Sequence, residues 1–276
     1  MSGVSSEVVS PFLRWAGGKR WLAPIVQDLV GGLDYRNYHE PFLGAGSIFF
    51  ALNPQRHAYL SDLNSELIST YEAVARNPSG IATRLLSHPN TAEHYYQVRG
   101  TRTRGYLSQA AAFIYLNHTS FNGLYRVNLN GRYNVPYGHR KHLRIPDTAH
   151  LLNVSRRLRN VTLSTQDFEK CIAKVRERDL VFLDPPYTVA HNNNGFVKYN
   201  QRLFAFEDQV RLLRTIKEID NRGAYYVLTN AAHESILELF GHMGRYIHVA
   251  RKSAISASAS ARGQAQEFLF TNIAEG

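Results

Sequence analysis

A run of four apolar residues, Leu180-Val181-Phe182-Leu183, stands directly before Asp184-Pro185-Pro186-Tyr187. A short apolar run that ends at prolines predicts a buried strand, and this strand delivers the next four residues to the edge of a sheet. There the Asp184 carboxylate and the carbonyl beside the prolines can each accept an amino hydrogen, while the Tyr187 ring can stack on a flat heterocycle. The stretch predicts a site for an aromatic amine. The alternative is an ordinary strand-ending turn, because Asp and Pro favour turns.

The rest of the chain alternates between strand-like and helix-like segments. Residues 37–52 indicate a short strand, a glycine turn and a helix, and residues 57–62 indicate a second strand. Further strand-like runs lie at 161–164, 180–183 and 224–229, a helical pattern at 207–220, and two closing strands at 246–251 and 267–271, separated by a Ser/Ala/Gly-rich loop. This alternation predicts an α/β fold with a doubly wound, Rossmann-like sheet.

The pattern changes between Tyr71 and about Arg144, where the sequence is basic and rich in Tyr, Asn and His. We interpret residues 71–144 as a smaller inserted domain, and residues 1–70 and 145–276 as the two parts of the main domain.

Charge and cysteine content restrict the class of partner. Among 276 residues, 32 Lys and Arg stand against 22 Asp and Glu, which gives a net charge of +10 and favours a polyanion such as nucleic acid. Cys171 is the single cysteine, so disulfides within the chain and thiolate zinc sites are excluded. Apolar runs such as 110–116 are too short to cross a bilayer, and we expect a soluble intracellular protein without a membrane or metal partner.

A glycine turn and a carboxylate suggest a nucleoside-type ligand. Gly44 and Gly46 allow a tight turn and a close backbone approach to a ligand, but the third glycine of the dinucleotide fingerprint is missing. Asp62 ends the next predicted strand, where it could accept both ribose hydroxyls of an adenosine-type cofactor. Alternatively, Asp62 caps the helix that begins near Asn64.

The segment Arg14-Trp15-Ala16-Gly17-Gly18-Lys19 offers an indole, a flexible backbone and a cation. It is not a phosphate-binding loop of nucleotide triphosphatases, because Leu13 and Arg20 occupy the places of a required glycine and a required Ser or Thr. A carboxylate is a better partner for Lys19. The alternative is a glycine turn with a solvated Lys19 and a core Trp15.

Residues 121–137 contain Asn130-Gly131 between two strand-like runs, which predicts a hairpin with a type I′ turn. A two-stranded ribbon can enter the major groove and present donors to bases and phosphates. The polar side chains in question are Arg126, Asn128, Arg132 and Asn134, with Tyr125 and Tyr133 available for packing or stacking. The alternative is a polar surface hairpin.

Five motifs in this order resemble the Dam family, the D12 class of DNA adenine-N6 methyltransferases. They are RWAGGK at 14–19, EPFLGAG at 40–46, SDLN at 61–64, NGLYRVNLNGRYNVPYG at 122–138 and DPPY at 184–187, and they span nearly the whole chain. The resemblance implies an S-adenosylmethionine-binding catalytic domain at 1–70 and 145–276 and a target-recognition domain at 71–144. It also implies methylation of adenine N6 in double-stranded DNA, with GATC as the expected site and the base flipped out of the duplex.

The resemblance also assigns roles to individual residues. Those implied to bind the cofactor are Trp15, Lys19, Phe42, Gly44, Gly46, Asp62, Asp167, Phe168 and Asp184. Those implied to form the catalytic loop are Asp184, Pro185, Pro186 and Tyr187, and the polar segment 191–199 suits a lid over the base. Those implied to contact DNA are Arg14, Asn122, Leu124, Arg126, Asn134, Pro136 and Arg140.

The chemistry expected of this loop follows from the electronic structure of adenine, whose amino lone pair is delocalised into the ring. Acceptors at Asp184 and the Pro185 carbonyl would hold the amino hydrogens, and Tyr187 would form a wall of the pocket for the flipped base. Two alternatives stay open: a catalytically silent DNA-binding relative, and a cytosine-N4 or RNA adenine methyltransferase. The sequence does not distinguish a restriction–modification enzyme from a phage or housekeeping one.

Overall fold

A computed structural model describes residues 9–128, 130–187, 204–252 and 264–275. The described residues form two compact units. Unit 1 comprises residues of Met1–Ala23, Leu43–Gln55 and Ser61–Thr165, and unit 2 comprises residues of Pro24–Phe42, Arg56–Leu60 and Gln166–Gly276. The residues predicted as a recognition domain, 71–144, all belong to unit 1. The proposed lid at 191–199 and most of the Ser/Ala/Gly-rich loop lie outside the described residues.

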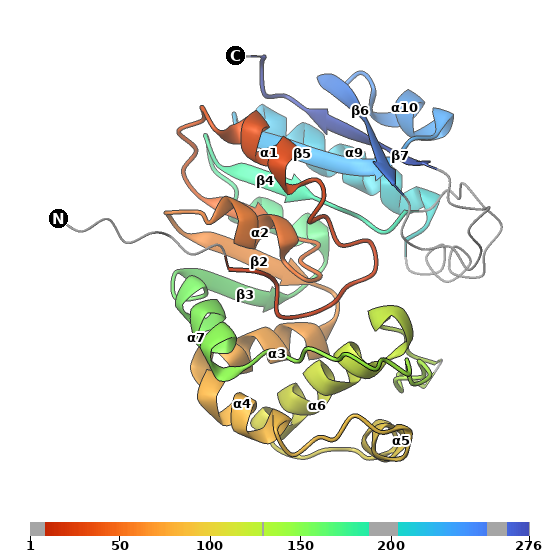
Figure 1. Cartoon of the computed structure of the whole chain (residues 1–276). Helices are drawn as coiled ribbons and strands as arrows, with labels where there is room; N and C mark the ends of the chain where they lie inside the picture. Colours follow the sequence, from red (N-terminus) through yellow and green to blue (C-terminus); the bar gives the residue numbers. More distant parts are fainter. Residues whose placement is uncertain (1–8, 129, 188–203, 253–263, 276) are drawn as a thin grey trace. The chain divides into compact units, whose positions relative to one another are not determined.

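The sheet has seven strands in the order β3-β2-β1-β4-β5-β7-β6 (Figure 1). The strands are β1 Tyr38–Glu40, β2 Ala58–Asp62, β3 Val161–Thr165, β4 Leu180–Leu183, β5 Tyr225–Ala231, β6 Arg245–Lys252 and β7 Gln264–Thr271. β1 is parallel to β2 and β4, β4 is parallel to β5, and β7 is antiparallel to β5 and β6. The predicted α/β class and the seven strands expected for the sheet are confirmed, and β4 has the predicted bounds.

The strand order reverses between β1 and β4. In open α/β sheets, ligands bind outside the carboxyl ends of the strands at such a switch point. A buried pair joins the amino-terminal side of this region, because His39 Nε2 lies 2.9 Å from Asp179 Oδ2. Burial alone would raise the pKa of Asp179, but hydrogen bonds from His39 and from the amides of Asn37 and Arg176 hold it below its ordinary value. This network secures β1 beside β4.

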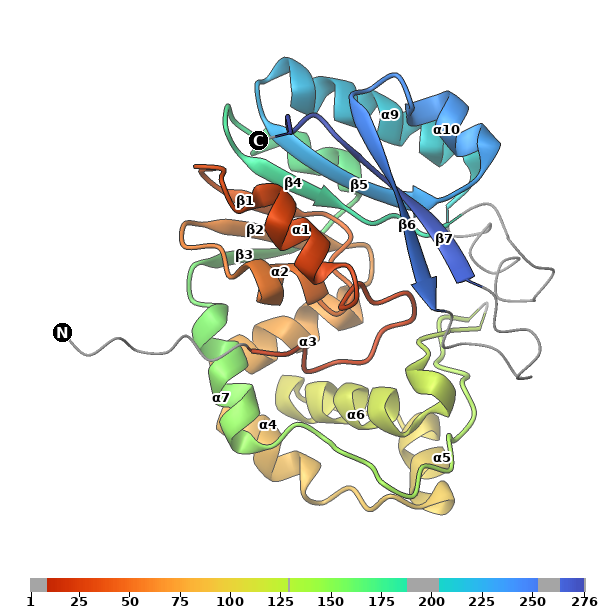
Figure 2. The ribbon, with the colours of Figure 1, turned by 45° about the horizontal axis from the view of Figure 1, so that its top comes forward.

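Helices cover both faces of the sheet in unit 2. These elements are α1 Ala23–Val30, which belongs to unit 2 from Pro24 on, the 3₁₀ helix η2 Phe168–Ala173, α9 Phe206–Asn221 and α10 Glu234–Phe240. Figures 1 and 2 show α1 and α9 on opposite faces, as a doubly wound sheet requires. The α9 side chains Leu212, Ile216 and Ile219 recur at helical spacing and are fully buried in one core with residues of β4 and β5.

Unit 1 is mainly helical. Its helices are α2 Ser47–Leu52, α3 Ser65–Arg76, α4 Pro78–Leu85, α5 Ala92–Gly100, α6 Tyr106–Thr119, the 3₁₀ helix η1 Phe121–Gly123 and α7 Thr148–Arg157. Side-chain caps set four of the starts, with Asn64, Asn77, Thr91 and Asp147 each accepting a backbone amide hydrogen in the first turn. The apolar run 110–116 lies within α6, and among the described residues no helix combines the length and the apolar character needed to cross a membrane.

Residues 121–137, called the recognition segment below, follow α6 and fold back on themselves, but the predicted type I′ turn at Asn130-Gly131 is wrong. Gly131 has a positive φ of 71°, and its amide donates to the Asn128 carbonyl at 2.9 Å, whereas in a two-residue turn centred on 130–131 this amide takes no part in the bond that closes the turn. The Asn128 side chain accepts from the amides of both Asn130 and Arg132, each at 3.0 Å. The two arms are joined by backbone bonds from the Asn128 amide to the Arg132 carbonyl at 2.8 Å and from the Asn134 amide to the Arg126 carbonyl at 3.0 Å. Among the described residues of this segment, the pairing takes the form of isolated antiparallel bridges, Val127 to Tyr133 and Ser120 to Tyr137.

Candidate active site

The glycine turn of unit 1 is held by Asp62. Gly44 and Gly46 have positive φ values of 48° and 65°, which glycine adopts without strain. The Gly44 amide donates to Asp62 Oδ2 at 3.1 Å, and Tyr71 Oη donates to the Gly44 carbonyl at 3.2 Å. The carboxylate at the end of β2 and the glycine turn therefore form one local structure.

Asp62 does not cap α3. The N-cap is Asn64, whose Oδ1 accepts the Leu67 amide hydrogen at 3.1 Å, so the alternative interpretation of Asp62 is wrong. Asp62 Oδ1 instead accepts the Asn64 amide hydrogen at 2.9 Å. Burial raises the pKa of Asp62 above its ordinary value, while hydrogen bonds from the amides of Asn64, Gly44 and Leu63 act in the opposite direction. Each carboxylate oxygen can accept more than one hydrogen bond, so acceptor capacity remains for a ligand.

The segment 14–19 is a folded part of unit 1. The Gly18 amide donates to the Trp15 carbonyl at 3.1 Å and closes a turn. Lys19 is only 4% exposed, so the alternative of a solvated lysine is wrong. The Trp15 ring covers Gly44, because a Cβ at position 44 would lie 2.9 Å from Trp15 Cδ1. Only glycine fits at this position without a shift of the indole.

The predicted catalytic loop lies in unit 2 at the carboxyl end of β4, beside the switch point. Thr229 Oγ1, on β5, donates to Asp184 Oδ1 at 2.7 Å. Tyr187 Oη donates to Glu267 Oε2, on β7, also at 2.7 Å, and Glu267 is only 4% exposed. Burial raises the pKa of Tyr187 well above its ordinary value, and the carboxylates of Asp184 and Glu267 raise it further. Asp184 and Tyr187, the two ends of the predicted catalytic loop, are thus held by side chains of β5 and β7.

Three of the residues predicted to bind the cofactor, Phe42, Asp167 and Phe168, form a second group in unit 2. The Phe42 ring stacks on the Phe168 ring, with centroids 5.2 Å apart, and Phe168 is buried. Asp167 Oδ1 accepts from Arg211 Nη2 at 2.8 Å and from the Glu169 amide at 3.0 Å. The Arg211 guanidinium also lies over the Phe168 ring, 4.9 Å from its centroid. Arg211 therefore fixes both Asp167 and Phe168, and Asp167 Oδ2 takes no part in these two contacts.

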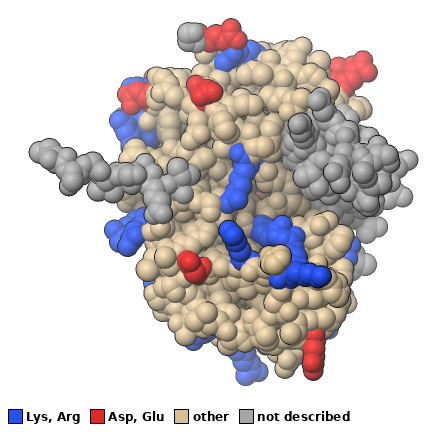
Figure 3. All heavy atoms as spheres, viewed as in Figure 1, with Lys and Arg blue, Asp and Glu red and all other residues tan. Residues whose placement is uncertain are grey.

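The predicted DNA-contacting residues lie on the surface of unit 1. Arg14, Asn122, Arg126 and Pro136 are exposed, and Leu124, Asn134 and Arg140 are partly buried. Arg126 Nε donates to Asn134 Oδ1 at 2.7 Å, so these two side chains act together. Figure 3 shows Lys and Arg side chains both in the middle of the visible face and along its edges.

Sequence patterns did not reveal three residues of unit 2 that hold predicted site residues in place. Thr229 and Glu267 anchor the predicted catalytic loop, and Arg211 anchors Asp167. Tyr125, predicted from the sequence to be available for packing or stacking, stacks on Trp15 in unit 1 with ring centroids 5.5 Å apart. Glu267 carries the clearest signal, because a carboxylate stands beside the apolar strand residues Phe268-Leu269-Phe270. An ionisable group that is buried in this way needs a partner.

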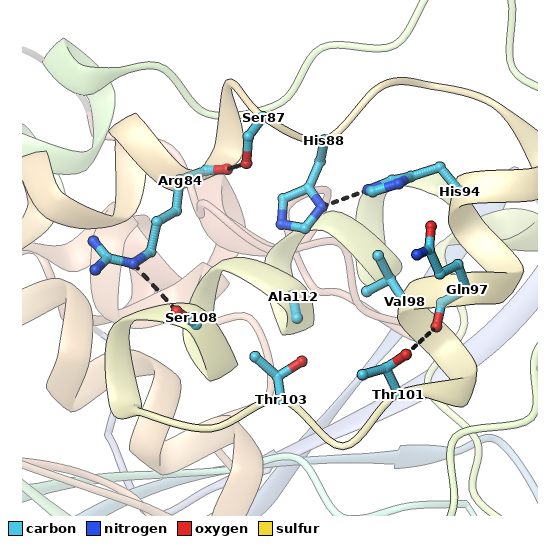
Figure 4. A pocket seen from close by; sticks show the side chains of 10 residues that line it. All are labelled: Arg84, Ser87, His88, His94, Gln97, Val98, Thr101, Thr103, Ser108 and Ala112. Atoms are coloured by element: carbon cyan, nitrogen blue, oxygen red, sulfur yellow. Dashed lines mark hydrogen bonds between the residues drawn. The ribbon is translucent and has the colours of Figure 1, made fainter.

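A cavity of about 300 Å³ lies apart from these groups, among α4, α5 and α6 (Figure 4). Polar side chains line it, including Arg84, which donates to Ser108 at 3.2 Å, and His88, whose Nδ1 lies 2.8 Å from His94 Nε2. None of the predicted site residues lines this cavity. Within the described ranges, no group of three or more His, Cys, Asp or Glu side chains is arranged to hold a metal ion.

Comparison with known proteins identifies the family. A sequence model of the D12 class N6 adenine-specific DNA methyltransferases matches residues 15–255. The chain is 35% identical to the type II methyltransferase M1.LlaDCHI of Lactococcus lactis, over 95% of each chain. It is 34% identical to the type II methyltransferase M.MjaIII of Methanocaldococcus jannaschii, over 85% of this chain and 88% of the relative. It is 31% identical to the DNA adenine methylase of Escherichia coli, over 94% of this chain and 93% of the relative.

A solved structure, precorrin-6y C5,15-methyltransferase from Geobacter metallireducens, shares 12% identity over 91% of this chain and 86% of the other, at a TM-score of 0.38. That likeness is too weak to support an argument. The match to the family model and the extended identity to three relatives are decisive, and the chain belongs to the D12 class of N6 adenine-specific DNA methyltransferases.

Proposed function

We propose that the protein uses S-adenosylmethionine to methylate adenine N6 within GATC sites of duplex DNA, after the base is flipped out of the helix. The observation that carries the proposal is the fixed position of Asp184 in the proposed catalytic loop. Asp184 is held at the carboxyl end of β4 by a 2.7 Å hydrogen bond from Thr229, and the Pro185 carbonyl follows it directly. Two acceptors supported by a rigid sheet are what a planar amino group requires.

The residues of unit 1 fit the cofactor's ribose and methionine parts. Gly44 has no side chain where the backbone would approach the ligand, and Trp15 covers the glycine from one side. Asp62 offers a carboxylate for the ribose hydroxyls, and Lys19 is a buried cation suited to a carboxylate partner. When bound, S-adenosylmethionine supplies a methyl group activated by the positive charge on sulfur.

The residues of unit 2 fit an adenine ring. Asp167 offers an acceptor for its amino group, and Phe42 and Phe168 offer aromatic surface. Arg211 would keep the Asp167 carboxylate in one orientation while the cofactor binds.

The protein's own part in the reaction is to hold the target amine. Hydrogen bonds from the amine to Asp184 and to the Pro185 carbonyl would draw its hydrogens out of the ring plane. The nitrogen lone pair would then lose its conjugation with the ring and become available for attack. The methylated nitrogen becomes strongly acidic, and its surplus proton passes to water or to Asp184. A stronger base than a carboxylate is not required. The hydroxyl of Thr229 keeps Asp184 oriented throughout.

Base flipping requires a pocket that repays the lost stacking. The Tyr187 ring is proposed as one wall of this pocket, since its hydroxyl is fixed on Glu267 and its orientation is thereby limited. On unit 1, the side chain of Phe121, the first residue of the recognition segment, is 51% exposed. Apolar side chains in such positions insert between base steps, and we propose that Phe121 occupies space left by the extruded base.

The proposed target sequence depends on the resemblance of the recognition segment to the Dam family. Arg126 would read a guanine in the major groove, Leu124 a thymine methyl group and Arg14 the outer guanine. Arg126→Ala should relax specificity at one position, because a bidentate contact contributes about 1–3 kcal/mol of discrimination. Lys141→Ala, a change at an exposed position, should weaken all sites alike and reduce the salt dependence. Methylation rates on GATC and on each single-base variant would test both expectations.

Asp184→Ala tests the reaction itself. Loss of one positioned hydrogen-bonding group typically costs ~10²–10³ in rate, whereas DNA affinity should change far less. Modified-base sequencing of DNA from cells that express the wild type or the variant reports the base, position and motif in one measurement. Methylated cytosine in place of adenine, or full activity in the variant, would contradict the proposal. A wild type that binds cofactor and DNA without methylation would favour a catalytically silent relative.

A further inference from the structure

Tyr125 stands between two residues proposed to read bases, Leu124 and Arg126, yet its own contacts are internal. Its ring stacks on Trp15, with centroids 5.5 Å apart and planes inclined by 18°. Its hydroxyl donates to Glu66 Oε2 at 2.9 Å. Glu66 lies in the first turn of α3, close after Asp62 in the chain. Both ends of the Tyr125 side chain therefore touch the surroundings of the glycine turn.

Trp15 completes the connection. One part of the indole packs against Gly44, and its ring stacks on Tyr125. Gly44 is in turn bound to Asp62 through its amide. The chain of contacts thus runs from the proposed ribose acceptor through the glycine turn and the indole to the centre of the recognition segment. All of these residues belong to unit 1.

The backbone of Arg14, the residue before Trp15, is fixed to the end of α6. Asn117, near the end of α6, accepts from the Arg14 amide at 2.8 Å and donates to the Arg14 carbonyl at 2.6 Å. A Cβ at Gly123 would lie 2.8 Å from Arg14 Cβ, so the two strands of chain are in close contact there. A displacement of Trp15 and Arg14 would therefore disturb their contacts with Tyr125 and Gly123.

We propose that Tyr125 is a positioning residue that couples cofactor binding to sequence reading. A cofactor that fixes Trp15 would also fix the Tyr125 ring, and the backbone of Tyr125 would then present Leu124 and Arg126 in their reading geometry. The coupling is reciprocal by thermodynamic necessity, so a cognate duplex would tighten cofactor binding by the same factor. This inference rests on the proposed function, because it takes the proposed roles of Trp15 and Arg126 as given.

The test measures four dissociation constants in a thermodynamic cycle: S-adenosylhomocysteine with and without a GATC duplex, and the duplex with and without S-adenosylhomocysteine. We expect the wild type to show a coupling factor of roughly 5–150, the usual range for linked sites. Tyr125→Leu should reduce the factor to near 1, while S-adenosylhomocysteine alone still binds. Tyr125→Phe keeps the stacked ring and should retain most of the coupling, which separates the role of the ring from that of the Glu66 bond.

A second readout uses the indole directly. The chain has two tryptophans, so Trp21→Phe leaves Trp15 as the single reporter. The GATC duplex alone should change Trp15 emission in this background, a duplex with one altered base should change it less, and Tyr125→Leu should abolish the difference.

The outcomes separate this inference from the proposed function. A wild type that binds neither S-adenosylhomocysteine nor the duplex would contradict the proposed function. A wild type that binds both, with a coupling factor that is unchanged in Tyr125→Leu or is already 1, would overturn the role of Tyr125 alone. If Tyr125→Leu fails to fold, the Tyr125→Phe cycle and the Trp15 emission of the Trp21→Phe variant still test the coupling. A Trp15 emission that does not change when the GATC duplex binds would refute it.

Discussion

Replacement of Tyr187 by Phe should separate the two tasks of this side chain. The substitution removes the hydroxyl that donates to Glu267 at 2.7 Å but keeps the ring proposed to stack on the flipped adenine. Glu267 is only 4% exposed, so its carboxylate loses a donor that water does not readily replace. A hydrogen bond to a charged group contributes about 1.5–3 kcal/mol. For a protein of this size, a loss of that magnitude corresponds to a fall in Tm of roughly 3–12 °C.

Activity should respond differently from stability. Because the ring stays, 2-aminopurine at the target position should still report base flipping in Tyr187→Phe, whereas Tyr187→Ala should lose most of that signal. Base–aromatic stacking contributes roughly 1–3 kcal/mol per base. The kcat of Tyr187→Phe, measured well below its Tm, should fall only modestly.

A double-mutant cycle with Glu267→Gln provides the control. The neutral amide is less costly to leave without the hydroxyl than the carboxylate, so the double variant should be more stable than the two separate losses predict. Additive losses would show that the two side chains do not interact. A Tyr187→Phe protein with the Tm of the wild type would refute the view that this hydrogen bond holds the loop.

Three further changes address the remaining parts of the site. Thr229→Val removes the donor to Asp184 and should lower kcat by roughly 10- to 100-fold, since such a bond contributes about 1.5–3 kcal/mol. Thr229→Ser keeps the hydroxyl and should retain the rate. Steady-state kinetics should show this change in kcat without a matching change in the KM for DNA. Gly44→Ala places a Cβ 2.9 Å from Trp15 at a strained positive φ and should weaken S-adenosylhomocysteine binding in calorimetry, and equal affinity would contradict the packing. Because burial raises the pKa of Asp62, S-adenosylhomocysteine affinity should begin to fall at a higher pH than for an ordinary aspartate as the solution is acidified. The affinity falls because the protonated carboxyl loses acceptor capacity. A raised folded-state pKa means that this protonation does not reduce folding stability, so Tm should not fall over the same pH range. Asp62→Asn should lack this pH dependence of affinity.

Local patterns in the sequence were sufficient to predict where the strands of the sheet lie along the chain. The run Leu180–Leu183 predicted β4 with its actual bounds, because an apolar run closed by two prolines leaves little choice of conformation. The glycines at 44 and 46 predicted a tight turn after the first strand, and both residues have positive φ values. These features depend on neighbouring residues, so the sequence by itself determined them.

The tertiary structure alone decided which side chains hold the site in place. Thr229 and Glu267 reach Asp184 and Tyr187 from 45 and 80 positions away, through the pairing and register of β4, β5 and β7. Strand register is set by the packing of the whole sheet, and no local pattern reports it. The turn at Asn130 differs from its prediction for a related reason. The Asn128 side chain accepts hydrogen bonds from the backbone amides of Asn130 and Arg132. Side-chain bonds of this kind offer the backbone an alternative to ladder bonds, and the sequence alone does not show which of the two forms.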